Sequence, residues 1–297
     1  MSLSDSISVF VATHIIRADR DPYIENQMIV ETIRQSREKL DLKNVQYYVY
    51  PDAKFNRTHP DLMKKYYDYL ESIKSLEGLK DTKINIMKDT RETMRSNWLK
   101  FIQEDCETPY MLFLEHDWGF TDPIDVDKIV NIFEKNEQVG YIKFNRFPHD
   151  NNMRNLGSHN NWDWIFEQEG DLDLELPLFK ISFFSGNPHI ARVKKCKEFY
   201  IPEMIKHCPP ESSRGTSHLE KDMKKAELFW IDSFRKCGVA KQSGHIWPLS
   251  RNQSVGSGCR DCEQAIRKYQ KEWGLFMLGD WGDSSRVFHL GEWCRKE

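Results

Sequence analysis

An apolar segment that ends in two acids constrains the fold of this 297-residue chain more than any other feature. Residues 110–114 read Tyr-Met-Leu-Phe-Leu and are followed at once by Glu115, His116 and Asp117. The apolar run alternates too little for a half-exposed strand, so it predicts a central strand of a sheet that is covered on both faces. In open α/β sheets, ligands bind outside the carboxyl ends of the strands. The sequence therefore predicts a binding site at residues 115–117.

The first half of the chain alternates between strand-like and helix-like segments. Strands are expected at residues 7–12, 45–50, 83–87, 110–114 and 139–144. Helices are expected between them, at residues 23–40, 61–76, 90–103 and 126–136. This alternation predicts right-handed βαβ units and a mostly parallel sheet, which is an α/β fold.

The pattern changes near residue 150. Strands are expected at residues 162–166 and 178–184, and helices at residues 190–207 and 219–237. Glycine-rich turns and several tryptophans follow, with one short strand ending at His289. We expect one fold made of two halves, residues 1–150 and residues 151–297, and not two independent domains.

The composition argues against several classes of protein function. The net charge of −3 argues against nucleic-acid binding, because such proteins carry a basic footprint. No apolar run approaches 18 residues and the first residues lack a basic, apolar leader, so we expect neither a membrane span nor a secretory signal. The seven cysteines indicate reduced thiols in a cytoplasmic protein. Cys259 and Cys262 have a zinc-like spacing, but without a second such pair we expect unliganded thiols.

The two acids after the apolar run favour a divalent cation. Glu115 and Asp117 are two residues apart, so on a regular strand both side chains point the same way and can reach one metal ion. Asp117 alone would also fit a simple turn or helix cap. Two acids directly after a buried strand favour the functional interpretation.

Two neighbouring segments carry a resemblance to a known family. They are Met94-Arg95-Ser96-Asn97-Trp98-Leu99 and the run from Thr108 to Asp117. Together they resemble the GT-A glycosyltransferases, in particular the inverting, family-2-like members. There, such a helix precedes a strand that runs into a DxD motif, whose carboxylates hold a divalent metal against the pyrophosphate of a nucleotide sugar. This chain departs from the motif at Glu115, which either binds the metal or contacts the ribose while Asp117 takes the metal.

The resemblance covers about residues 7–145 and implies roles for individual residues. It implies a Rossmann-like nucleotide-sugar-binding half over residues 1–150 and an acceptor-binding half over residues 151–297. The implied donor-binding residues are Thr13, His14, Asp52, Arg95, Glu115 and His116. The implied metal, Mn²⁺ or Mg²⁺, would be held by Asp117, Glu115 and His289. Ordinary structural roles stay open, since Thr13 and Asp52 also suit turns and His289 also suits a core.

The second half supplies candidates for the acceptor side. The segment from Ser217 to Asp222 resembles the acidic helix start that provides the catalytic base in inverting GT-A enzymes, through Glu220 or Asp222. Ser217 followed by Glu220 is also a capping box. Trp162 and Trp164 could stack on sugar rings. The turn at Ser185-Gly186 could line the acceptor pocket or cap a helix.

The resulting expectation is a metal-dependent glycosyltransferase that moves a sugar from a nucleotide-diphosphate donor, with uridine diphosphate favoured, to a hydroxyl of a glycan acceptor with inversion. One alternative is a metal-dependent nucleotidyltransferase or phosphoesterase, although no glycine-rich phosphate loop follows Ala12. The other is a carbohydrate-binding scaffold without catalysis. The oligomeric state is left open.

Overall fold

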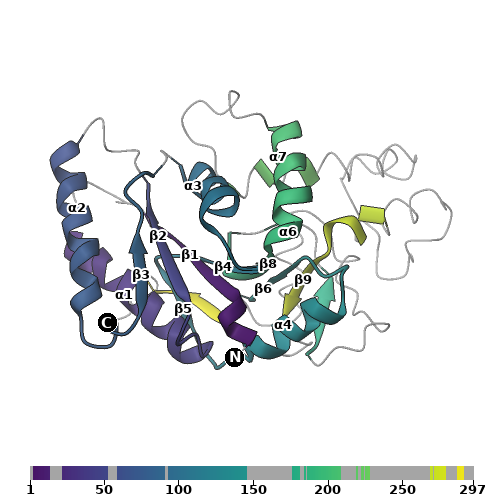
Figure 1. Cartoon of the computed structure of the whole chain (residues 1–297), viewed down its shortest axis with the longest axis horizontal. Coiled ribbons are helices and arrows are strands. Elements are labelled where there is room, and N and C mark those ends of the chain that lie inside the picture. Colours follow the sequence, from purple (N-terminus) through teal and green to yellow (C-terminus); the bar gives the residue numbers. More distant parts are fainter. Residues whose placement is uncertain are drawn as a thin grey trace, which may run out of the picture.

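Eight strands form the central sheet of the computed structural model (Figure 1). The structure describes residues 3–13, 22–52, 59–90, 93–145, 176–180, 184 and 186–208, and then residues 219, 222–223, 225–227, 268–269, 271–278 and 286–290. In spatial order the strands are β3 (Lys83–Ile86), β2 (Gln46–Pro51), β1 (Ile7–Thr13), β4 (Tyr110–Glu115), β8 (His189–Arg192), β6 (Tyr141–Lys143), β9 (Leu275–Leu278) and β7 (Leu178–Lys180).

The sheet is mixed but mostly parallel. Strands β1 to β4 run in the same direction, and β6 and β9 pair parallel with each other. Strand β8 is antiparallel to both β4 and β6, and β7 is antiparallel to β9. A second, two-stranded sheet pairs β5 (Trp118–Phe120) antiparallel with β10 (Val287–His289). The predicted α/β class with a mostly parallel sheet is therefore confirmed.

Helices cover both faces of the sheet (Figure 1). One layer contains α1 (Pro22–Lys39), α2 (Pro60–Ser72) and α4 (Val126–Lys135). The opposite layer contains α3 (Met94–Lys100), which continues as the π-helix η4 (Phe101–Asp105), and the continuous helical stretch α6 (Val193–Lys195), η6 (Cys196–Tyr200) and α7 (Ile201–His207). Short 3₁₀ turns, η1 (Leu3–Ser6) and η3 (Ile73–Ser75), precede β1 and follow α2.

Strand β4 is buried on both faces, as the uniform apolar run predicts. Tyr110, Leu112 and Leu114 face the layer of α1, α2 and α4, whereas Met111 and Phe113 face the layer of α3 and α6–α7. None of these side chains is more than 2% exposed. Burial of each is worth about 1.5–3 kcal/mol relative to exposure, so the strand is a rigid support for the residues that follow it.

The segment after residue 188 corrects one prediction. Residues 190–207 were expected to be wholly helical, but His189–Arg192 form strand β8 and the helix begins at Val193. The reason is pairing on both edges: Ile190 lies opposite Leu112 of β4 and Ile142 of β6, and its side chain is fully buried. Backbone partners on two sides outweigh a helix-like spacing of apolar residues.

Other boundaries differ by smaller amounts. Helix α3 begins at Met94, because Thr93 caps it by accepting a hydrogen bond from the backbone N–H of Ser96 at 3.2 Å. Strands β5 and β9 were not predicted. The strand expected at residues 162–166 lies outside the described residues. So do residues 146–175, so the division of the chain near residue 150 stays a prediction.

Two expectations from composition concern the described helices and cysteines. None of the helices in the described ranges combines the length and the apolar character needed to cross a membrane. Cys106, Cys196 and Cys208 are buried free thiols, and burial raises the pKa of each. Cys259 and Cys262 lie outside the described residues.

Candidate functional site

The predicted acids lie in a turn at the carboxyl end of β4. Glu115 is the last residue of the strand and pairs with Ala12 of β1, while His116 and Asp117 form the turn into β5. Glu115 and Asp117 are half-buried and His116 is buried. Strand alternation places Glu115 on the same face as Phe113, which is the face covered by α3.

Strand β10 brings the backbone of His289 to this turn. His289 lies directly opposite Trp118, the residue after Asp117, and the backbone N–H of Leu290 donates to the carbonyl of Asp117 at 2.8 Å. The side chain of His289 lies outside the described part. Among the described side chains, no three histidines, cysteines or acids form a group that could hold a metal ion. Two carboxylates at one strand end are nonetheless ligands of the type that hard divalent cations take.

The predicted donor-binding residues of β1 and β2 lie at the same edge of the sheet. The backbone N–H of Asp52 donates to the carbonyl of Thr13 at 2.8 Å, and the buried hydroxyl of Thr13 is hydrogen-bonded to the hydroxyl of Tyr66. Asn97 of α3 donates from Nδ2 to Oδ1 of Asp52 at 3.2 Å. The carboxyl ends of β1, β2 and β4 thus meet beside α3. His14 lies outside the described residues.

Asn97 and Tyr66 are polar contacts of this edge that the sequence did not single out. Asn97 is fully buried, and its position in the Arg-Ser-Asn segment of α3 was the available signal. Tyr66 comes from α2, and no local pattern connects it with Thr13, which is 53 residues away.

Arg95 and Asp222, predicted for different roles, contact each other. Nη1 of Arg95 lies 2.8 Å from Oδ2 of Asp222, and their side chains are 2% and 6% exposed. Arg95 also donates to the carbonyl of Cys208, just after α7, and Lys225 lies 3.6 Å from the other oxygen of Asp222. This buried ion pair joins α3 to the segment after α7. Donor binding by Arg95 and base catalysis by Asp222 stay predictions, while Glu220 lies outside the described residues.

The predicted acceptor turn is tied to the same segment. Glu227 is fully buried and accepts a hydrogen bond from the backbone N–H of Phe184 at 2.7 Å. Gly186 is half-buried, and the carbonyl of Pro188 accepts from the N–H of Phe144 at 2.9 Å. Because β8 runs antiparallel to β4 and β6, this turn lies at the edge where those two strands end. Ser185, Trp162 and Trp164 lie outside the described residues.

His189 begins β8 near this edge but is not a surface group. Its ring stacks on Phe113 with centroids 4.9 Å apart, contacts Tyr141 and Phe184, and shares a hydrogen bond between Nδ1 and the carbonyl of Asn187 at 2.8 Å. Burial lowers the pKa of His189 to about 3. The ring is therefore neutral at physiological pH.

Comparison with known proteins gives structural similarity alone. No family model matches the chain, and no curated protein matches it. Similar solved structures include the mannosyltransferase Ktr4p from S. cerevisiae, with 14% identity and a TM-score of 0.38 over 76% of this chain and 64% of that chain. Mouse xyloside xylosyltransferase 1 in its apo form has 9% identity and a TM-score of 0.38, over 95% of this chain and 97% of that chain.

A cytidylyltransferase from Leptospira borgpetersenii serovar Hardjo-bovis is also similar, with 11% identity and a TM-score of 0.36 over 69% of this chain and 70% of that chain. The similar solved structures therefore include glycosyltransferases, the class that the sequence resembles, together with a nucleotidyltransferase. Similarity at these TM-scores identifies no activity.

Proposed function

We propose that this chain is a GT-A-type glycosyltransferase that transfers a sugar from a nucleotide-diphosphate donor, with a uridine diphosphate sugar favoured, to a hydroxyl of a glycan acceptor with inversion. One observation carries the proposal: Glu115 ends a central strand that is covered on both faces, and Asp117 follows in the turn, at the edge where β1 and β2 also end. That edge is where open α/β sheets bind nucleotides.

The proposed metal is Mn²⁺ or Mg²⁺, held by Asp117 and Glu115, with His289 as the third ligand. When bound, such an ion supplies charge neutralisation for the departing diphosphate. The backbone of β10 lies beside this turn, with His289 opposite Trp118 and the N–H of Leu290 bonded to the carbonyl of Asp117. Thr13 and Asp52 lie at the adjacent strand ends, so we assign them to the nucleoside side of the donor, with Asn97 of α3 holding the carboxylate of Asp52.

The catalytic base is proposed to be Glu220 and not Asp222. A base must accept the proton of the acceptor hydroxyl as its oxygen bonds to the sugar and the bond to the diphosphate breaks. The carboxylate of Asp222 is buried and bonded to Arg95, which supports a structural role. In this proposal Asp222 fixes its segment against α3, and the nearby Glu220 takes the proton.

One set of measurements tests the proposal. Nucleotide sugars are screened for stabilisation of the protein against thermal unfolding, with and without Mn²⁺, and hits are assayed for transfer to glycan acceptors. We expect Asp117→Asn to reduce transfer by about 100-fold or more while the melting temperature stays close to that of the wild type. Glu220→Gln is expected to retain donor binding and lose turnover.

The matched control is Asp81→Asn, the same chemical change in an exposed turn before β3, at the opposite edge of the sheet. It should leave transfer and donor binding unchanged. Full transfer by the Asp117 variant would refute the metal role. Exchange of labelled pyrophosphate into a nucleotide sugar, without transfer to any acceptor, would instead identify a nucleotidyltransferase.

A further inference from the structure

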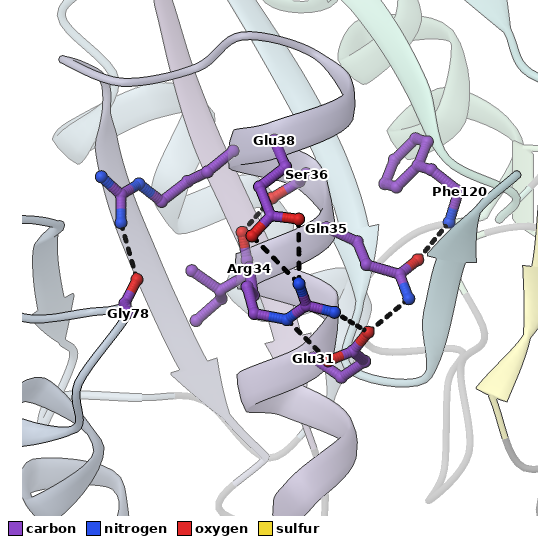
Figure 2. A network of polar contacts seen from close by, with 9 residues as sticks. Glu31, Arg34, Gln35, Ser36, Glu38, Gly78 and Phe120 are labelled. Atoms are coloured by element: carbon purple, nitrogen blue, oxygen red, sulfur yellow. Dashed lines mark hydrogen bonds and ion pairs between the residues drawn. The ribbon is translucent and has the colours of Figure 1, made fainter. Parts of the chain in front are cut away.

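Helix α1 packs against the turn that carries Asp117 and hydrogen-bonds its backbone. The hydroxyl of Thr32 donates to the carbonyl of His116 at 2.8 Å, and both groups are buried. One turn further along the same helix, Oε1 of Gln35 accepts the backbone N–H of Phe120 at 2.7 Å (Figure 2). Two side chains on one helix face therefore bond the backbone on both sides of Asp117.

These contacts restrict the backbone of Asp117 itself. The peptide group before it is held through its carbonyl, at His116, by Thr32. The peptide group after it is held through the carbonyl of Asp117 by the N–H of Leu290 at 2.8 Å. When both flanking peptide planes are fixed, φ and ψ of the residue are fixed, and so is the direction in which its Cβ leaves the chain.

The amide of Gln35 is itself oriented by charged neighbours (Figure 2). Its Nε2 donates to Glu31, whose carboxylate also accepts two hydrogen bonds from Arg34, at 2.9 and 2.6 Å. Hydrogen bonding from Arg34 lowers the pKa of Glu31, so this carboxylate stays an acceptor at neutral pH. An amide with its nitrogen on Glu31 must present its oxygen to Phe120, and a flipped amide would lose both bonds.

Helix α1 and strand β10 pack closely against β5 at Gly119. Gly119 lies between them, opposite Phe288 in the β5–β10 pair. A Cβ atom at this position would lie 2.8 Å from Oε1 of Gln35 and 2.6 Å from Cζ of Phe288. The absence of a side chain at residue 119 lets Gln35 approach the backbone of β5.

We propose that Thr32 and Gln35 are positioning residues for the metal-binding carboxylate of Asp117. They touch neither the donor nor the metal, and they act by fixing the backbone that bears the ligand. This inference rests on the proposed function, because it gives α1 a role only if Asp117 binds a metal. Groups that orient metal ligands typically change metal affinity or activity by about 10–100-fold when they are removed.

The test measures Mn²⁺ binding by calorimetry and sugar transfer as a function of Mn²⁺ concentration. Thr32→Val and Gln35→Met remove the hydrogen-bonding groups with little change in size. We expect each to raise the dissociation constant for Mn²⁺ about 10-fold, with a smaller change in kcat at saturating Mn²⁺. Thr32→Ser keeps the hydroxyl and should restore wild-type binding.

The chain offers matched controls on the same helix. Ser36→Ala removes a buried hydroxyl one turn after Thr32 that bonds Tyr47 instead of the acidic turn. Glu38→Gln removes the charge of an exposed carboxylate that pairs with Arg34. Both controls should bind Mn²⁺ within about twofold of the wild type, because neither touches residues 115–120.

A second measurement uses the metal-free protein. Amide exchange at Phe120 should accelerate about fivefold in Gln35→Met and stay unchanged in the other variants.

The outcomes separate the two proposals. Weaker Mn²⁺ binding in Thr32→Val and Gln35→Met, with unchanged controls, supports the positioning role. Binding as tight as in the two controls overturns it while the proposed function stands. If the wild type neither binds Mn²⁺ nor transfers sugar, the proposed function fails and the positioning role fails with it. Should Thr32→Val not fold, Gln35→Met at its partly exposed site decides the result.

Discussion

Removal of the Arg95 guanidinium is expected to destabilise the protein strongly. In Arg95→Met, the carboxylate of Asp222 would stay buried without the charge that now lies 2.8 Å away. Lys225 lies 3.6 Å from that carboxylate, but its side chain is 64% exposed, so water screens its attraction. Breaking a buried pair from one side costs about 3–5 kcal/mol. The carbonyl of Cys208 also loses its donor.

The double variant Arg95→Met, Asp222→Leu should be far less affected than the single variants suggest. With both charges removed, the main remaining penalty is the carbonyl of Cys208, about 1–3 kcal/mol for a buried unsatisfied group. Asp222→Leu alone leaves the guanidinium buried and unbalanced, so we expect about 3–5 kcal/mol for it as well. The double-mutant cycle should therefore report a coupling free energy of about 3 kcal/mol or more.

Urea unfolding followed by circular dichroism measures these free energies. A shift of the midpoint at constant m shows that stability changed and not the unfolded state. A double variant destabilised by the sum of the two single variants would refute the buried ion pair as the cause. The same double variant addresses donor binding: if it folds and still binds a nucleotide sugar as the wild type does, Arg95 does not contact the donor phosphates.

Two further predictions concern single positions. Because burial lowers the pKa of His189 to about 3 from an ordinary 6.5, its contribution to stability is complete above about pH 6.5 and falls by about 1.4 kcal/mol per pH unit toward pH 3. His189→Phe should flatten that slope by one proton in urea unfolding between pH 7 and 4, and an unchanged slope would exclude this histidine as its source. Gly274→Ala should destabilise by about 3 kcal/mol or more, since φ is +57° and a Cβ atom would lie 2.1 Å from the carbonyl oxygen of Gln138. The control Gly78→Ala, with φ of +82° and open space, should lose only about 1 kcal/mol, and equal losses would contradict the steric argument.

Local pattern was sufficient where structure depends on neighbours in the sequence. The uniform apolar character of residues 110–114 predicted a strand covered on both faces, and the helical spacing in residues 23–40 predicted α1 within about one residue. Strand β8 was missed because its four residues are strand only through pairing with β4 and β6. Strand β5 has three residues, which is too short to show a period of two.

The candidate site, like the fold, could be predicted from the sequence only in part. The acids at residues 115 and 117 were visible because they follow a strand directly. The contact between Arg95 and Asp222 joins residues 127 positions apart, and the contact between Thr32 and the carbonyl of His116 joins residues 84 apart. Every residue has a backbone carbonyl, so residue types cannot show which carbonyl Thr32 will bond. The support that α1 gives to the turn could therefore be identified only from the structure.

The pairing of β5 with β10 also has a consequence for the order of folding. The two strands are roughly 170 residues apart in the sequence, whereas β1, β2, β3 and β4 all come from the first 115 residues. Contacts between residues so far apart in the sequence gain free energy only after the long loop between them has closed, so they tend to form late. We expect β1 to β4 to assemble first, and the hydrogen bond from the N–H of Leu290 to the carbonyl of Asp117 to be the last part of the candidate site to form.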